Sequence, residues 1–315
     1  MPYEVRCDSR THPGRMDSNS LIAVARDNMS IMGERMPRIA VHAHVFYSEL
    51  WGELWLCIRN YIDLLGEENV HLYVTYPKEN KELADRLVNA IPFAVFCPVP
   101  NLGYDIGPFI EVLHHVNLSD FDYFVKVHTK RDVKDGWVNF RHYAGGEWRK
   151  RLLSFCMTKE AVLRSLHAFD SQPDLGMVAD GMMIDPSGIA SCNHRDFSDS
   201  IVRELGLTPR GRTIVWGTMF MVRARLLEPF LRLKLEDFSS PSKIDPHKIE
   251  GMASRVEGAF GMVVNALGYR VSDGRGGCFC ATLKALILRF VYTIMRYASD
   301  ILRSIIGCYK KRRDG

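Results

Sequence analysis

Residues 93–130 read FAVFCPVPNLGYDIGPFIEVLHHVNLSDFDYFVKVHTK, and this stretch decides the fold. Two short apolar runs, at 93–97 and 123–127, have the length and composition of buried strands. Between them, Pro108 opens an apolar segment at 108–116 that predicts a helix, because proline is favoured at the first helical position. A strand, a helix and a second strand in this order predict two parallel strands joined by a crossover helix.

The same alternation precedes this stretch. Strands are predicted at 39–46 and 70–76, and helices at 49–65 and 80–90. The helix at 49–65 places leucine and isoleucine side chains on one face, as expected of a helix that covers a sheet. Strands that alternate with helices predict an α/β fold, with a mostly parallel, Rossmann-like sheet flanked by helices.

The second half of the chain is less regular. The elements predicted there are strands at 175–179, 214–223 and 268–271, and helices at 226–233 and 249–267. The strand at 214–223 is interrupted by a glycine. We predict a single domain over residues 37–275, between a poorly ordered N-terminal segment at 1–36 and an amphipathic helical tail at 281–315.

The composition excludes several classes of protein. Apolar residues make up 47% of the chain and charged residues 25%, close to globular averages. No uncharged apolar run reaches about 18 residues, which argues against a membrane-spanning helix. The eight cysteines form no Cys-x-x-Cys pair, so a zinc ribbon or a thioredoxin-like site has no support. Because the first residues also lack the apolar run of a signal peptide, we expect a reducing, cytoplasmic compartment.

The net charge of +4 is concentrated near the C-terminus. Residues 281–315 hold eight Lys or Arg and two Asp, a net charge of +6, which leaves −2 for the rest. A slightly acidic body binds phosphate backbones poorly, so we expect no nucleic-acid partner. In the tail, Arg289, Arg296, Arg303 and Lys310 recur every seven residues and form a basic stripe on a helix. This pattern predicts a helix at an anionic membrane surface, and the alternative is a helix that docks on the protein's own sheet or pairs as a short coiled coil.

Polar groups and glycines follow the predicted strands. Asn101, Gly103 and Asp105 come after the strand at 93–97, and His128 and Lys130 come after the strand at 123–127. In open parallel sheets, ligands bind beyond the carboxyl ends of the strands. The carboxyl edge is therefore the predicted site. The alternatives are that Asp105 only caps the following helix and that the basic turn is only solvated.

Three motifs and one acidic residue carry a family resemblance. They are Asn101-x-Gly103-x-Asp105-Ile106-Gly107-Pro108-Phe109, Lys126-x-His128-Thr129-Lys130, Trp216-Gly217-Thr218-Met219-Phe220, and Glu257, eleven residues before Gly268-Tyr269. With these motifs the chain resembles the rhamnan synthesis protein F family of bacterial polysaccharide glycosyltransferases, over about residues 38–272. One departure is that Gly258 follows Glu257, where the family has Arg. The order of the motifs is also similar to that of nucleotide-sugar transferases with a GT-A fold.

The resemblance implies a glycosyltransferase with a GT-A-like domain. It would move rhamnose or another deoxyhexose from a nucleotide-sugar donor to a cell-surface polysaccharide or lipid-linked glycan acceptor, with inversion. The expected site residues are Glu257 as general base, Asn101, Gly103, Asp105, Lys126, His128 and Lys130 for the donor, and Trp216 for the acceptor or its pocket. Asp180, in the loop after the predicted strand at 175–179, is a further candidate for the acceptor. The alternative is a non-catalytic subunit that binds sugar nucleotides or acts as a scaffold in a polysaccharide assembly complex.

The position of the metal-binding Asp-x-Asp motif of GT-A enzymes is filled here by His128-Thr129-Lys130. Cations do not hold a metal ion, but they can face a diphosphate directly. We therefore expect fixed positive charge from Lys130 and His128 in place of a metal, and no cofactor. If Mg²⁺ or Mn²⁺ is used instead, Asp105 and Asp132 are the candidate ligands.

Overall fold

The computed structural model describes residues 35–132, 136–138, 141–143, 146–186, 195–238 and 251–275. The chain divides into two units, Met1–Met36 and Pro37–Gly315, and the described helices and strands all belong to the second. The predicted tail and nearly all of the predicted N-terminal segment lie outside the described residues. None of the described helices is long and apolar enough to cross a membrane.

A seven-stranded sheet runs through the second unit in the order β11-β7-β10-β4-β1-β2-β3. Its first half consists of four parallel strands joined by helices. The strands are β1 (Ile39–His44), β2 (Val70–Pro77), β3 (Val95–Val99) and β4 (Tyr123–His128), and the helices are α2 (Trp51–Leu65), α3 (Lys81–Ala90) and α4 (Ile106–His115). The predicted α/β fold with a mostly parallel sheet flanked by helices is confirmed.

The second half of the sheet is built from shorter strands. It consists of β7 (Leu175–Val178), β10 (Phe220–Arg223) and β11 (Arg270–Ser272). Strand β10 runs antiparallel to both β4 and β7, whereas β11 runs parallel to β7. Its helices are α5 (Glu147–Leu152), α6 (Lys159–Ser171), α7 (Arg195–Glu204) and α8 (Met252–Ala266).

The predicted strand at 214–223 is wrong as a single element. The chain forms β9 (Ile214–Val215), which pairs with β8 (Ile184–Asp185), and then β10 in the main sheet. Between them, Gly217 has a φ of 75° and Thr218 a φ of 52°. A strand requires negative φ, so these two residues end the first extended segment and turn the chain before the second begins.

Shorter elements complete the described fold. They are the strands β5 (Gly136–Val138) and β6 (Arg141–Tyr143), and the 3-10 helices η1 (Ser48–Leu50), η2 (Glu67–Asn69), η3 (Leu118–Asp120), η5 (Ala224–Arg232) and η6 (Leu235–Phe238). The helix predicted at 226–233 is thus the 3-10 helix η5. It contains Pro229, which removes a backbone donor that an α-helix would use.

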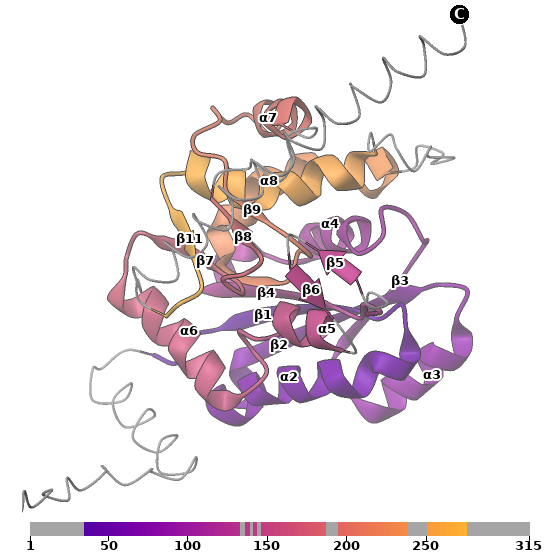
Figure 1. Cartoon of the computed structure of the whole chain (residues 1–315). Helices are drawn as coiled ribbons and strands as arrows, with labels where there is room; N and C mark the ends of the chain where they lie inside the picture. The colour runs from indigo at the N-terminus through magenta and orange to yellow at the C-terminus, as the bar shows by residue number, and fades with distance from the viewer. Residues whose placement is uncertain are drawn as a thin grey trace, which may run out of the picture. The chain divides into compact units, whose positions relative to one another are not determined.

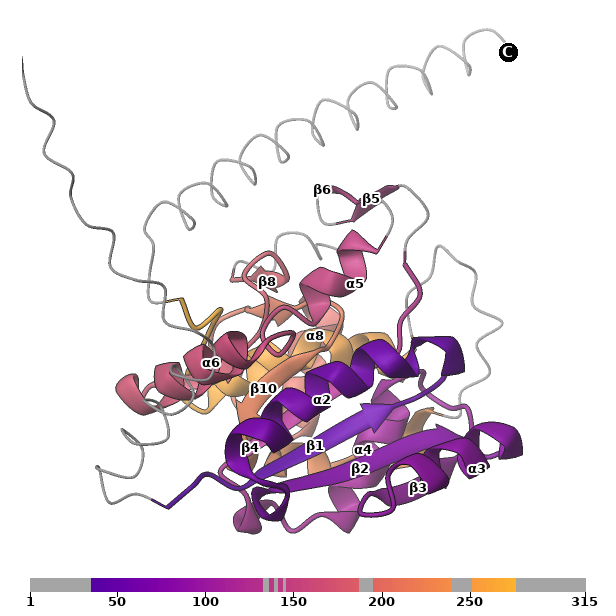
Figure 2. The ribbon, with the colours of Figure 1, turned by 90° about the horizontal axis from the view of Figure 1, so that it is seen from below.

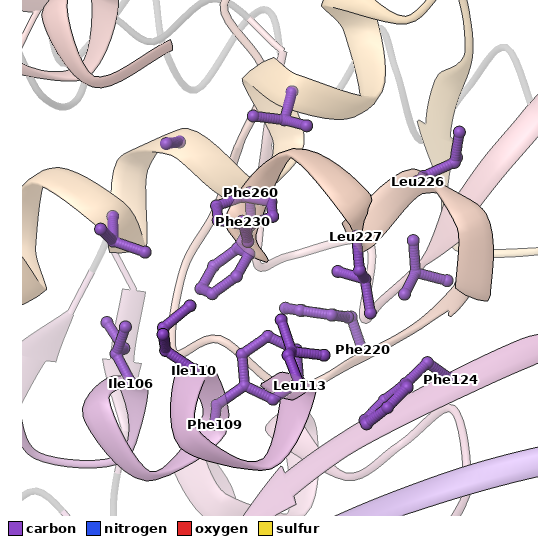
Figure 3. Close-up of a cluster of buried hydrophobic side chains, with 14 of the residues drawn as sticks. Ile106, Phe109, Ile110, Leu113, Phe124, Phe220, Leu226, Leu227, Phe230 and Phe260 are labelled. Carbon is purple, nitrogen blue, oxygen red and sulfur yellow. The ribbon is translucent and has the colours of Figure 1, made fainter. Parts of the chain in front are cut away.

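The sheet lies between two layers of helices, with α2, α3 and α6 on one face and α4 and α8 on the other (Figure 1, Figure 2). On the second face, a buried cluster rich in phenylalanine joins α4, α8 and η5 to the sheet (Figure 3). The ring of Phe109 in α4 meets those of Phe220 and Phe260 at 6.3 and 5.6 Å, in edge-to-face geometry. This packing fixes α4 and α8 on the sheet, and Asp105 and Glu257 lie near the N-terminal ends of these two helices.

Candidate active site

The Asp105 carboxylate is the centre of a polar cluster at the carboxyl edge of the sheet. Its Oδ2 accepts hydrogen bonds from Lys126 Nζ and from Thr218 Oγ1, both at 2.6 Å, and His128 Nδ1 lies 3.5 Å away. Asp105 stands at the N-cap of α4, yet its side chain caps no backbone N–H. The capping alternative is therefore wrong, because the carboxylate is bonded across the sheet instead.

Lys126 is buried inside the sheet with 0% exposure. Besides Asp105, its ammonium donates to the carbonyl oxygen and to the hydroxyl of Thr218, both at 3.1 Å. The ammonium is therefore directed at protein groups and holds Asp105 in one orientation. Burial acts to raise the pKa of Asp105, but His128, Lys126 and Lys130 hold that pKa well below its usual value. Asp105 is consequently ionised at neutral pH.

One oxygen of Asp105 stays accessible. The side chain is 17% exposed, and among the described residues no hydrogen bond reaches Oδ1. A carboxylate oxygen accepts hydrogen bonds only, so Oδ1 is suited to a hydroxyl of a bound ligand. Lys126 thus holds the Asp105 carboxylate so that Oδ1 can accept a hydrogen bond from a ligand at the surface.

Two histidines lie beside Lys126 on the same face of the sheet. His42 in β1 is in register with Lys126, and His44 is in register with His128. The two imidazoles share the hydroxyl of Thr75, at 2.8 and 3.0 Å. Burial lowers the pKa of His42 well below its usual value and that of His44 to about 4. Both histidines belong to the buried interior of the sheet.

His128 is also buried, and neither ring nitrogen has a hydrogen-bond partner. Burial lowers its pKa well below the usual value, with Asp105 opposing the shift. The imidazole is therefore neutral at pH 7, and our expectation that it adds fixed positive charge is corrected. The physical reason is desolvation, which disfavours the charged form inside the sheet.

The turn at Gly217 and Thr218 connects Asp105 to Glu257. Thr218 bonds to Asp105, and the N–H of Gly217 donates to Glu257 Oε1 at 3.3 Å. Among the described residues, the two non-glycine residues with positive φ are Tyr104, at 56°, and Thr218. The first precedes Asp105 in sequence and the second bonds to it. Strained backbone of this kind concentrates at functional sites.

Glu257, the predicted general base, lies in the second turn of α8 and belongs to the same cluster. Burial raises the pKa of Glu257, Lys130 opposes the rise, and Asp105 adds to it. Glu257 is partly buried, and the nearby Arg255 bonds to Ser200 and Glu204 rather than to Glu257. A carboxylate whose pKa is raised toward neutral is suited to accepting a proton.

Lys130 follows β4 and is partly buried. Its positive charge acts to lower the pKa values of Asp105, Lys126, His128 and Glu257. In the described part of the chain, no residue forms a hydrogen bond or an ion pair with its side chain. Lys130 is thus the cation of the cluster with charge left for a ligand.

The end of β4 is tied to the end of β1. The hydroxyl of Thr129 accepts the backbone N–H groups of Phe46 and Tyr47 at 2.9 and 3.0 Å. Next along the chain, Arg131 pairs with Glu49 and stacks on the ring of Tyr47. β1 lies between β2 and β4, so these loops flank the point where the strand order reverses, where ligands of such sheets bind.

Among the described residues, the remaining predicted ones form no hydrogen bond or ion pair with this cluster. Asn101 is exposed at the start of the turn that Gly103 continues with a φ of 69°. A side chain at Gly103 would also collide with the ring of Phe238, so both the positive φ and the lack of space require glycine there. Trp216 is partly buried beside Gly217. Asp180 is buried after β7, where it accepts hydrogen bonds from Ser154 and from the N–H of Met182.

Sequence reasoning did not single out Thr218 or Tyr104. Thr218 stood inside a quoted motif but was assigned to a strand, and the glycine before it was the available signal. As for metal binding, the described residues contain no group of three His, Cys, Asp or Glu side chains placed to hold an ion. Asp132, a candidate ligand, is paired with Arg149 at 2.7 Å. The expected absence of a metal cofactor stays a prediction.

The sequence matches the family described as Rhamnan synthesis protein F over residues 16–269. The chain belongs to the rhamnan synthesis protein F family. The matched range contains Asp105, Lys126, Lys130, Thr218 and Glu257, so the whole cluster lies within the rhamnan synthesis protein F region. The family connects the chain to the synthesis of rhamnan polysaccharide. A search of curated proteins finds no match.

Proposed function

We propose that this protein is an inverting glycosyltransferase with a GT-A-like domain. It moves rhamnose or another deoxyhexose from a nucleotide-sugar donor to a growing polysaccharide or lipid-linked glycan. The observation that carries the proposal is that the turn at Gly217 and Thr218 joins Glu257 to Asp105 at the carboxyl edge of the sheet, through hydrogen bonds of 3.3 and 2.6 Å. The family's connection to polysaccharide synthesis supports the same reaction class.

The transfer needs a base and a positive charge. The acceptor hydroxyl oxygen attacks the anomeric carbon, and the bond from that carbon to the nucleoside diphosphate breaks, with its electron pair leaving on the diphosphate. Glu257 takes the hydroxyl proton, and its raised pKa favours this role. Lys130 faces the charge that grows on the leaving diphosphate.

The rest of the cluster orients the donor. Asp105 Oδ1 accepts a donor hydroxyl, and Lys126 and Thr218 fix the carboxylate from behind. His128 is buried and neutral, so it lies beside Asp105 without adding charge to the donor site. In this scheme Lys126 acts on the donor through Asp105.

The test is release of nucleoside diphosphate from dTDP-, UDP- and GDP-sugars in the presence of a lipid-linked acceptor. We expect release with one donor, and a loss of about 100-fold or more in Lys130→Ala. Lys234→Ala, at an exposed lysine outside the cluster, is the matched control and should keep full activity. No release with any donor would overturn the proposal.

The same assay tests the metal. If Lys130 replaces an ion, activity survives EDTA. Loss of activity with EDTA and recovery with Mn²⁺ would contradict the cationic scheme and would direct attention to Asp105 as a ligand.

A second candidate is a non-catalytic subunit that binds sugar nucleotides. Gly258, which stands where the resemblance implies Arg, favours it. Binding of a nucleotide sugar without release of diphosphate, in the presence of acceptor, would favour this candidate over the enzyme.

The proposed place of action is the cytoplasmic face of a membrane. The basic stripe of the tail supports this, because each Lys or Arg near an anionic surface adds about 1 kcal/mol of attraction. Removing residues 283–315 should leave a folded protein that no longer sediments with anionic liposomes. Equal sedimentation of the shortened protein would contradict the membrane role of the tail.

A further inference from the structure

Tyr104 is an exposed aromatic residue on strained backbone. Its side chain is 65% exposed, and its φ of 56° is in the left-handed region that favours glycine. The turn around it is held by other groups, since the N–H groups of Ile106 and Gly107 both donate to the carbonyl of Gly103. The ring of Phe238 lies against Gly103. The tyrosine ring itself contributes nothing to these contacts.

The Tyr104 ring is without a partner among the described residues. No ring contact, cation–π contact or hydrogen bond involves it there. Glycine at this position would relieve the backbone and lose no described contact. The tyrosine therefore lowers stability, and no described contact of its ring offsets that cost. An exposed aromatic ring on a fixed turn is suited to stacking on a ligand.

The turn lies above the binding edge of the sheet. It leads from β3, the edge strand, to Asp105, which contacts β4, and β2 and β1 lie between these two strands. With neighbouring strands about 4.8 Å apart, the turn crosses about 14 Å of the carboxyl edge. Tyr104, the residue just before Asp105, is thus placed near the reversal of strand order between β1 and β4, where a nucleotide would lie.

We propose that Tyr104 stacks on the nucleobase of the donor. The inference rests on the proposed function and adds a residue that positions the nucleoside. Asp105 Oδ1 accepts a ribose hydroxyl, and the neighbouring ring covers the base, so that two adjacent residues match two adjacent parts of one nucleoside. Stacking uses the π-face that every base has, and it requires an aromatic side chain that is accessible before the ligand arrives.

The experiment compares Tyr104→Gly with Tyr104→Phe in the full-length protein. Titration calorimetry with free dTDP, UDP and GDP measures nucleotide affinity, and thermal unfolding without ligand measures stability. For Tyr104→Gly we expect a dissociation constant about tenfold higher and a melting temperature about 2–4 °C higher, because the φ strain is relieved. Tyr104→Phe keeps the ring, so affinity and melting temperature should stay at the wild-type values.

A matched control uses another exposed aromatic residue. Phe93 precedes β3, at the opposite end of that strand from the turn, and is 37% exposed. Phe93→Ala should leave nucleotide affinity unchanged. If the wild-type protein binds nucleotide and Tyr104→Gly binds it equally well, the stacking role is wrong and the proposed function stands. If the wild-type protein binds none of the nucleotides, the stacking role and the proposed function fail together. If Tyr104→Gly raises only the acceptor KM in the diphosphate-release assay, the ring contacts the acceptor and the inference is overturned.

Discussion

The two halves of the sheet differ in regularity. In β3, β2, β1 and β4, strands and helices alternate, all pairs are parallel, and the register is continuous across β1 and its two neighbours. In β10, β7 and β11 the strands are shorter, one runs antiparallel, and the register shifts between Arg270 and Val271. The regular half builds a rigid edge, whereas the irregular half brings the chain back to that edge from a different direction.

The candidate site lies where the halves meet. β10 pairs with β4, and Phe220 is in register with Lys126. The regular half supplies Asp105, Lys126 and Lys130, and the irregular half supplies Thr218 and Glu257. The cluster therefore forms only when both halves are folded. Substitutions at this junction should therefore show how much each half of the sheet contributes to stability and how much to the proposed chemistry.

The largest effect is expected at Lys126. Lys126→Met removes the ammonium and leaves Asp105 ionised against Thr218 alone, so we expect a loss of about 3–5 kcal/mol in the free energy of unfolding. Chemical denaturation measures it. Adding Asp105→Asn should return part of this loss, because the carboxylate that needed the ammonium is then gone. A loss below about 1 kcal/mol in the single variant would show that the buried pair does not hold the halves together.

Acid should destabilise the regular half. Burial lowers the pKa of His44 to about 4, whereas an unfolded histidine titrates near 6.5. Between these pH values the unfolded chain binds more protons, so stability falls as the pH falls from about 6.5 to 4, by up to about 3 kcal/mol. His44→Gln should flatten this part of the stability profile. His115→Gln, at an exposed histidine, should not, and an unchanged profile in His44→Gln would contradict the assignment.

The regular half could be predicted from the sequence because its signals are local. The apolar run at 123–127 gave β4, which the structure extends by one residue to His128. In the other half, helix α6 was not predicted, although Thr158, which accepts the N–H of Ala161, is a recognisable cap. For the strands and helices of the regular half, the periodicity of neighbouring residues was sufficient.

The irregular half and the inner site depend on contacts that are distant in sequence. Gly217 and Thr218 interrupt the apolar run at 214–223, but only their positive φ angles show that they separate two strands. Lys126 is compatible with a buried strand only because Asp105, 21 residues earlier, meets it. His128 was expected to be charged because its burial was unknown. The placement of Glu257 near Lys130 was implied by the family resemblance, and no local pattern gave it.

The chemical contribution of the irregular half is tested at Glu257. Glu257→Gln should lower turnover about 100-fold or more, which corresponds to about 2.7 kcal/mol of transition-state stabilisation. Stability should change in the opposite direction. Because burial raises the pKa of Glu257, the wild-type protein becomes less stable as the pH rises through that pKa and the buried carboxylate ionises. Glu257→Gln should therefore be more stable than wild type at neutral pH and equally stable below about pH 4. Glu228→Gln, at an exposed glutamate, is the control, and full turnover in Glu257→Gln would remove the proposed base.

The smallest expected effect isolates one hydroxyl at the junction. Thr218→Val keeps the β-branched shape and hence the strain of a φ of 52°, but it removes the group that donates to Asp105 and accepts from Lys126. A hydrogen bond to a charged group contributes about 2 kcal/mol, and that is the loss we expect in the free energy of unfolding. Thr218→Ser keeps the hydroxyl and should stay within about 0.5 kcal/mol of wild type. If Thr218→Ser loses stability and Thr218→Val does not, the methyl group holds the turn, and the tie between the halves is packing rather than a hydrogen bond to the buried pair.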